Sequence, residues 1–128
     1  MRRLRSSFHY AIQGVSYVLR TQPNMKIHTI IGVLAILAGF YFHITTPEWL
    51  ALVIVIGFVL ILEVVNTAVE TLVDLYTEEY HDLAKASKDT AAGAVLLMAG
   101  VSVVVGLIIF GPRLWQLIIT TVTAMGGI

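Results

Sequence analysis

The sequence predicts an all-α integral membrane protein with an N-terminal amphipathic surface helix and three transmembrane helices. Of its 128 residues, 58% are hydrophobic and 12% are charged, a balance far more apolar than that of a soluble globular domain. Three apolar segments come near the roughly 20 residues that a helix needs to cross a bilayer. The segment before them has an amphipathic pattern instead of a continuous apolar run. We expect residues 1–128 to form a single domain.

Residues 1–22 are expected to form the surface helix. Their apolar side chains recur at helical spacing, at Leu4, Phe8, Ala11, Ile12, Val15, Val18 and Leu19, which gives the helix one apolar stripe. Such a helix places its stripe in the acyl boundary and its arginines among the headgroups. Pro23 separates it from the first span because proline cannot continue the backbone hydrogen-bond ladder of a helix.

The spans are expected at about 27–44, 49–75 and 90–110. Before the second span, Thr46 can cap a helix N-terminus, Pro47 suits the first helical position and Glu48 favours the helix dipole. A tight hairpin is therefore predicted between the first two spans. The Gly111-Pro112 pair is expected to end the third helix. The tail at 114–128 is too short to span, and its sequence suggests no function.

Lysine and arginine placement predicts the orientation of the chain. Five basic residues precede the first span, two lie in the 76–89 loop, and one follows the third span: Arg2, Arg3, Arg5, Arg20 and Lys26, then Lys85 and Lys88, then Arg113. Because cytoplasmic flanks of spans are enriched in such residues, the N-terminus and the loop should be cytoplasmic.

Composition also excludes several classes of function. The chain has no cysteine, so disulfides, Cys-ligated zinc and thiol catalysis are excluded. Its formal net charge is zero, which gives no indication of a nucleic-acid partner. Neither of the glycine-rich motifs of the common nucleotide-binding folds is present.

Four polar residues of the second span fall on one helix face. At about 100° per residue, Glu63, Asn66, Glu70 and Asp74 cover an arc of about 80°. Ionisable groups within a membrane are costly and are usually functional. The alternative is a polar seam that joins helices by hydrogen bonds. Because three spans form a thin layer, a single copy should leave part of this arc poorly enclosed, and we expect a homo-oligomer.

A second cluster of polar residues lies in the loop before the third span. It comprises Glu79, Tyr80, His81, Lys85, Lys88 and Asp89. Such a run can be a solvated loop, or its lysines can meet an anion at a helix N-terminus. Carboxylates with a nearby lysine suit phosphoryl transfer from ATP, which requires Mg²⁺ and a cation on the phosphates. His28 is equally compatible with an interfacial and a functional role.

These motifs resemble the prokaryotic diacylglycerol kinase family of small membrane kinases with three spans. The similarity rests on Glu63-Val-Val-Asn66-Thr-Ala-Val-Glu70 with Asp74, on Glu79-Tyr80-His81, and on Lys88-Asp89 leading into the third span. It extends over roughly residues 3–115. Asn24-Met-Lys26-Ile-His28 and Gly106-Leu-Ile-Ile-Phe110 are most similar to the Gram-positive branch, whose members resemble undecaprenol kinases.

The resemblance implies roles for individual residues, with ATP and Mg²⁺ as cofactors. Glu63 matches the general base that takes the proton of the lipid hydroxyl, and Asn66 matches a polar partner beside it. Glu70 matches a metal ligand. The residues expected at the nucleotide are Arg3, Tyr10, Gln22, Glu70, Asp74, Glu79, Tyr80, His81, Lys88 and Asp89. The family is also trimeric, with active sites shared between subunits, and its members lie in the bacterial cell membrane.

One departure from the family pattern concerns the metal. Gln22 stands where many members have a second metal-binding glutamate, and a neutral ligand would weaken divalent-metal binding. Three functions remain at this point. A lipid kinase that phosphorylates undecaprenol is favoured, with diacylglycerol as the alternative acceptor. A transporter would have polar groups through the depth of the membrane, and a non-catalytic scaffold is conceivable with Gln22.

Overall fold

The computed structural model describes residues 2–77 and 79–126, with only the backbone for residues 2 and 3. Its elements are α1 (Arg2–Thr21), α2 (Pro23–Tyr41), α3 (Thr46–Tyr76) and α4 (Asp82–Gly126). The described residues contain no strand, and α2, α3 and α4 are each long and apolar enough to cross a membrane. The predicted fold class is confirmed.

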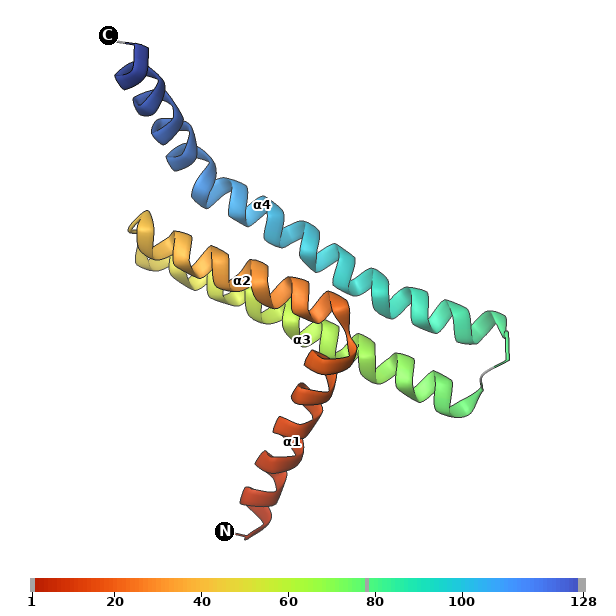
Figure 1. Ribbon diagram of the computed structural model, residues 1–128. Coiled ribbons are helices and arrows are strands. Elements are labelled where there is room, and N and C mark those ends of the chain that lie inside the picture. Colours follow the sequence, from red (N-terminus) through yellow and green to blue (C-terminus); the bar gives the residue numbers. More distant parts are fainter. Residues whose placement is uncertain (1, 78, 127–128) are drawn as a thin grey trace.

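The central helix of the bundle is α3, which packs against both α2 and α4 (Figure 1). One side of α3 is buried along much of its length, through Leu52, Val55, Val59, Glu63, Asn66 and Thr67. From Leu52 to Asn66 they follow one another at intervals of three or four, and Thr67 lies four residues after Glu63, so all of them share a helix face. The polar residues of α3 thus continue the same buried stripe that its apolar residues begin.

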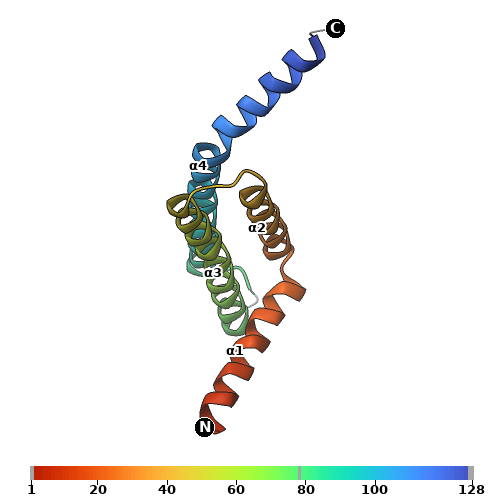
Figure 2. The ribbon, with the colours of Figure 1, turned by 90° about the vertical axis from the view of Figure 1, so that its left-hand side faces the viewer.

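The first helix, α1, leaves the bundle at a corner and projects away from it (Figures 1 and 2). Val18 near the end of α1 and Met25 in the first turn of α2 are both 4% exposed and anchor this corner. The outer part of the helix is open, since Leu4 and Phe8 are 68% and 65% exposed. The amphipathic helix predicted at 1–22 is therefore present, and its apolar stripe is largely uncovered by the rest of the chain.

A Schellman motif ends α2 and forms the hairpin to α3. Ile44 N–H donates to Gly39 O over 3.2 Å and His43 N–H donates to Phe40 O over 3.3 Å, the two bonds that define this helix ending. His43 takes the left-handed conformation, with φ of 49°. Gly39 is required here because a Cβ atom would lie 2.8 Å from the Trp49 ring.

Several predicted helix ends are wrong by a few residues. The cap of α3 is Thr45 and not Thr46: Glu48 Oε2 accepts from Thr45 N–H over 2.7 Å and from Thr45 Oγ1 over 2.9 Å. The first span begins at Pro23, because proline is acceptable in the first helical turn. The helix α4 begins at Asp82, eight residues before the predicted start, and the loop shortens accordingly.

The Gly111-Pro112 pair does not end α4, which is the largest difference from prediction. Pro112 lies inside the helix, and the predicted tail at 114–128 continues it as far as Gly126. Proline is tolerated inside membrane helices where other groups satisfy the backbone carbonyl that it leaves without a donor. Arg113, the residue after Pro112, donates to Ile109 O of the preceding turn. It also donates to the Glu48 carboxylate through two bonds of 2.9 Å.

Candidate functional site

The polar face of α3 passes from buried to exposed toward the end of the helix. Glu63 is 2% exposed and Asn66 is 6% exposed, whereas the Asp74 side chain is 56% exposed. All four predicted residues belong to one unbroken helix, as expected. As expected, a single copy leaves part of the arc poorly enclosed, at Asp74. Glu63 and Asn66 are buried because α3 turns these side chains into its own bundle.

Asn66 and Glu70 form a pair one helical turn apart. Asn66 Nδ2 donates to Glu70 Oε1 over 3.0 Å, as side chains at i and i+4 can. Asn66 Oδ1 is buried and has no hydrogen-bond partner among the described residues. A buried acceptor without a partner costs about 1 to 3 kcal/mol, so this oxygen is available to a group that binds between the two side chains.

The buried carboxyl of Glu63 has neighbours on two helices. It lies close enough to His28 of α2 and to Glu70 of α3 for electrostatic interaction. His28 also lines an apolar crevice of about 210 Å³, together with Val59 of α3 and Gly106 of α4. The crevice lies where the three spans meet. His28 thus both lines this crevice and interacts electrostatically with the Glu63 carboxyl.

A polar groove lies at the end of the bundle where α3 and α4 are joined. It has a volume of about 450 Å³ and is lined by Val73, Asp74, Thr77, Glu79, Tyr80, His81, Ala84, Lys85, Lys88 and Asp89. Six of the predicted nucleotide-binding residues are among these lining residues. Chain folding thus brings together groups from the end of one helix, a short loop and the start of the next.

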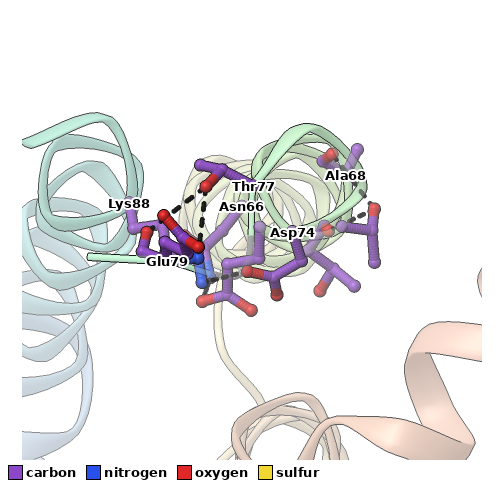
Figure 3. Close-up of polar contacts among 9 residues, drawn as sticks. Asn66, Ala68, Asp74, Thr77, Glu79 and Lys88 are labelled. Atoms are coloured by element: carbon purple, nitrogen blue, oxygen red, sulfur yellow. Dashed lines mark hydrogen bonds and ion pairs between the residues drawn. The ribbon is translucent and has the colours of Figure 1, made fainter. Parts of the chain in front are cut away.

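Ion pairs order the side chains of this groove. Lys88 of α4 pairs with Asp74 of α3 (Figure 3), and Lys85 pairs with Asp89 within α4. In the loop, Glu79 N–H donates to Thr77 Oγ1 over 3.2 Å, a contact also drawn in Figure 3. The two lysines give the groove cations that could meet phosphate oxygens, and carboxylates hold them in place.

The predicted contacts on α1 are not brought to this groove within one chain. Tyr10 is 68% exposed on a helix that projects away from the bundle (Figure 2). Gln22 is half-buried at the corner between α1 and α2, and no described hydrogen bond joins it to Glu70. The Arg3 side chain lies outside the described residues.

The oxygen atoms of Asn66 and Glu70 on α3 are too few to hold a metal ion by themselves. They suit a metal ion that is also bound by the phosphates of a nucleotide. The described residues contain no group of three His, Asp or Glu side chains that could hold a metal ion. Mg²⁺ is usually bound through one or two carboxylates together with substrate phosphates. Glu70 carries one such carboxylate, and the unpartnered Asn66 Oδ1 beside it is a further oxygen donor.

Two residues at these sites had no individual role predicted from the sequence, although Lys85 was included in the polar cluster before the third span. Lys85 lines the groove beside Lys88, and its spacing of four residues from Asp89 was the available signal. His28 was left undecided, because its proximity to Glu63 depends on the packing of α2 against α3.

The chain is similar to known proteins over most of its length. A family model described as prokaryotic diacylglycerol kinase matches residues 9–110. The chain is 40% identical to an undecaprenol kinase of Bacillus subtilis over 114 residues, covering 89% of this chain and 93% of that protein. It is 46% identical to a diacylglycerol kinase of Synechocystis, covering 88% of this chain and 65% of that protein. It is 24% identical to a diacylglycerol kinase of Escherichia coli, covering 89% and 90%.

Proposed function

This chain belongs to the prokaryotic diacylglycerol kinase family and is a bacterial membrane lipid kinase that uses ATP, and we propose that its acceptor is the hydroxyl group of undecaprenol. The observation that supports undecaprenol as the acceptor is the 40% identity to an undecaprenol kinase over 93% of that protein. Diacylglycerol is the second candidate because of the 46% identity to a diacylglycerol kinase. Both lipids present a hydroxyl group near the headgroups.

In the proposed reaction, Glu63 is the general base. Its carboxylate takes the proton of the lipid hydroxyl while the lipid oxygen forms a bond to the γ-phosphorus of ATP. The bond between that phosphorus and the β–γ bridging oxygen breaks, and ADP leaves. Burial of Glu63 at 2% exposure supports this role, since a base works best where water cannot compete with the substrate. The apolar crevice lined by His28 would take up part of the lipid chain.

The remaining predicted residues would bind and orient ATP. Lys88 would neutralise phosphate charge, while Asp74, Asp89 and the loop residues Glu79, Tyr80 and His81 line the groove around it. Glu70, with Asn66 Oδ1, would hold the Mg²⁺ that accompanies the phosphates, and the metal would reduce the charge that builds up on them. Gln22 would contribute a weaker, neutral ligand.

The proposal includes a homotrimer whose active sites are shared, with the N-terminus in the cytoplasm. Its support is the separation of Tyr10 from the groove within one chain, because α1 of a neighbouring subunit could supply the missing contacts. Orientation rests on the seven lysines and arginines near the N-terminus and the α3–α4 loop.

An assay with two acceptors tests the proposed function. Purified protein in mixed micelles would receive ATP and Mg²⁺ with either undecaprenol or diacylglycerol, and product formation would be measured over a range of lipid concentrations. We expect the higher kcat/KM with undecaprenol. A higher value with diacylglycerol would reassign the acceptor, and no transfer to either lipid would contradict the proposed activity.

A further inference from the structure

The last part of α4, residues 114–126, is a segment for which the family offers no role. The family match ends at residue 110. The segment contains no charged residue. Figures 1 and 2 show this part of α4, drawn in blue, projecting past the α2–α3 hairpin. We refer to residues 114–126 as the C-terminal segment.

The pair formed by Arg113 and Glu48 marks where the membrane crossing of α4 stops. The side chains are 25% and 28% exposed and lie beside the non-helical turn that joins α2 to α3. Charged groups and irregular backbone are both costly in hydrocarbon and collect at its edge. The 45 residues of α4 would extend about 68 Å, whereas the hydrocarbon core is about 30 Å thick. The C-terminal segment must therefore lie beyond the crossing.

The segment is strongly apolar and uncovered by the rest of the chain. Its large apolar side chains are 43% to 74% exposed: Leu114, Trp115, Leu117, Ile118, Ile119, Val122 and Met125. A straight continuation of α4 into water would leave all of this apolar surface in contact with water, which is unfavourable. Something other than water must cover it.

The pattern of the segment suits a membrane surface. Gln116, Thr120 and Thr123 fall within an arc of about 60°, and most apolar side chains lie on the opposite side. Thr120 and Thr123 donate to the carbonyls of Gln116 and Ile119 over 2.8 and 2.7 Å, so their hydroxyl groups are satisfied without water. Trp115 lies two residues after Arg113, close to the charged boundary, where tryptophan is favoured at membrane interfaces.

We propose that the C-terminal segment is a second amphipathic helix, which lies on the membrane surface with the boundary between headgroups and acyl chains as its partner. A bend at Pro112 brings it there, since proline removes one backbone hydrogen bond and is a common cause of helix kinks. Lipid is favoured over a protein partner because the segment continues the lipid-facing side of α4, where Val104, Leu107 and Ile108 are exposed. It also carries no charge that would select a protein surface.

The absence of cysteine makes a direct test possible. Single cysteines would be placed at each position from 115 to 125 in the full chain, spin-labelled and reconstituted in lipid nanodiscs. Collision rates with oxygen, which concentrates in lipid, and with a water-soluble nickel chelate would then be measured. Ile108 in the span serves as the lipid reference and Tyr80, which is 79% exposed in the loop, as the water reference.

We expect the ratio of oxygen to nickel collisions to vary with a period of about 3.6 residues. Ile118 and Val122 should resemble the lipid reference, and Gln116 and Thr120 should resemble the water reference. A Pro112→Ala variant should weaken this variation by straightening the helix. High nickel collision rates at every position would show that the segment extends into water. Low rates with both reagents, together with immobile labels, would show a protein partner. Either result would overturn the proposal.

Discussion

At the scale of single residues, Glu63 is the group on which the proposed chemistry depends. It is almost fully buried, yet it remains near His28 and Glu70 and close to an apolar crevice. A structural seam would require interhelical hydrogen bonds, and none of the described hydrogen bonds uses the Glu63 side chain. This arrangement favours the functional interpretation over the seam.

The first prediction is that Glu63→Gln lowers turnover by about 10² to 10⁴-fold, the usual contribution of a positioned base. The amide keeps the size of the side chain but cannot accept the proton. Turnover would be measured with saturating ATP and lipid in detergent. The control is Glu48→Gln, the same substitution on the same helix, where Glu48 pairs with Arg113 away from the site. Turnover of Glu63→Gln equal to the control would remove the assignment.

The second prediction concerns Gln22, the neutral residue at the predicted metal position. Gln22→Glu adds a hard anionic ligand, so the Mg²⁺ concentration needed for half-maximal rate should fall. The matched control is Gln13→Glu, an identical change on α1, where Gln13 bonds to His9 over 3.0 Å. The control should leave the Mg²⁺ titration unchanged. If both variants shift it equally, the effect is one of general charge and Gln22 does not face the metal.

At the scale of elements, the α2–α3 hairpin is held by close packing around one glycine. The ring of Trp49 contacts the Phe40 ring, with centroids 4.8 Å apart, and lies where a Cβ atom on Gly39 would be. The Trp49 ring therefore occupies the space beside Gly39 and Phe40. Together with the bonds between Glu48 and Arg113, this packing couples the hairpin to α4.

The third prediction is that Gly39→Ala destabilises the protein by about 1 to 3 kcal/mol, the usual cost of overpacking. The control is Gly57→Ala in α3, where an added Cβ has nothing within 4 Å and alanine is the better helix former by about 1 kcal/mol. Reversible unfolding in mixed micelles would report both changes. A Gly39→Ala variant as stable as the Gly57→Ala variant would mean that the Trp49 ring moves aside freely.

At the scale of the whole molecule, α1 lies apart from the groove between α3 and α4, although Tyr10 and Arg3 of α1 are predicted to contact the nucleotide there. The loop groove and the α3 face belong to one chain, but α1 points away from the bundle (Figure 1). Either α1 acts only as a membrane anchor, or it reaches the site of a neighbouring subunit. These two possibilities differ in what mixed oligomers can do.

The fourth prediction is that Glu63→Gln subunits and Tyr10→Ala subunits, both impaired alone, regain activity when co-assembled. If α1 serves a neighbour, random pairing restores about a quarter of the sites in an equal mixture. The control mixes Glu63→Gln with Asp74→Asn, because both residues lie on α3 and no mixed site recovers both. Absence of rescue in the Tyr10 mixture despite demonstrated co-assembly would count against shared sites.

The amino-acid sequence was sufficient for the fold class, the number of helices and the face of α3 that carries the polar residues. These follow from composition and from periods of three to four residues, which are local properties of the chain. The same local reasoning misplaced helix ends. It took Gly111-Pro112 for a stop, because it could not include the pairing of Arg113 with Glu48 across 65 positions.

Only the tertiary structure decided which side chains are buried and which are near one another. Burial of Glu63, its proximity to His28 and the ion pair between Lys88 and Asp74 all depend on how α2 and α4 pack against α3. Packing of this kind joins residues that are distant in the chain, and helical periodicity carries no information about such distances. Periodicity can show that four polar residues share a face, but the neighbouring helices determine which of them water reaches.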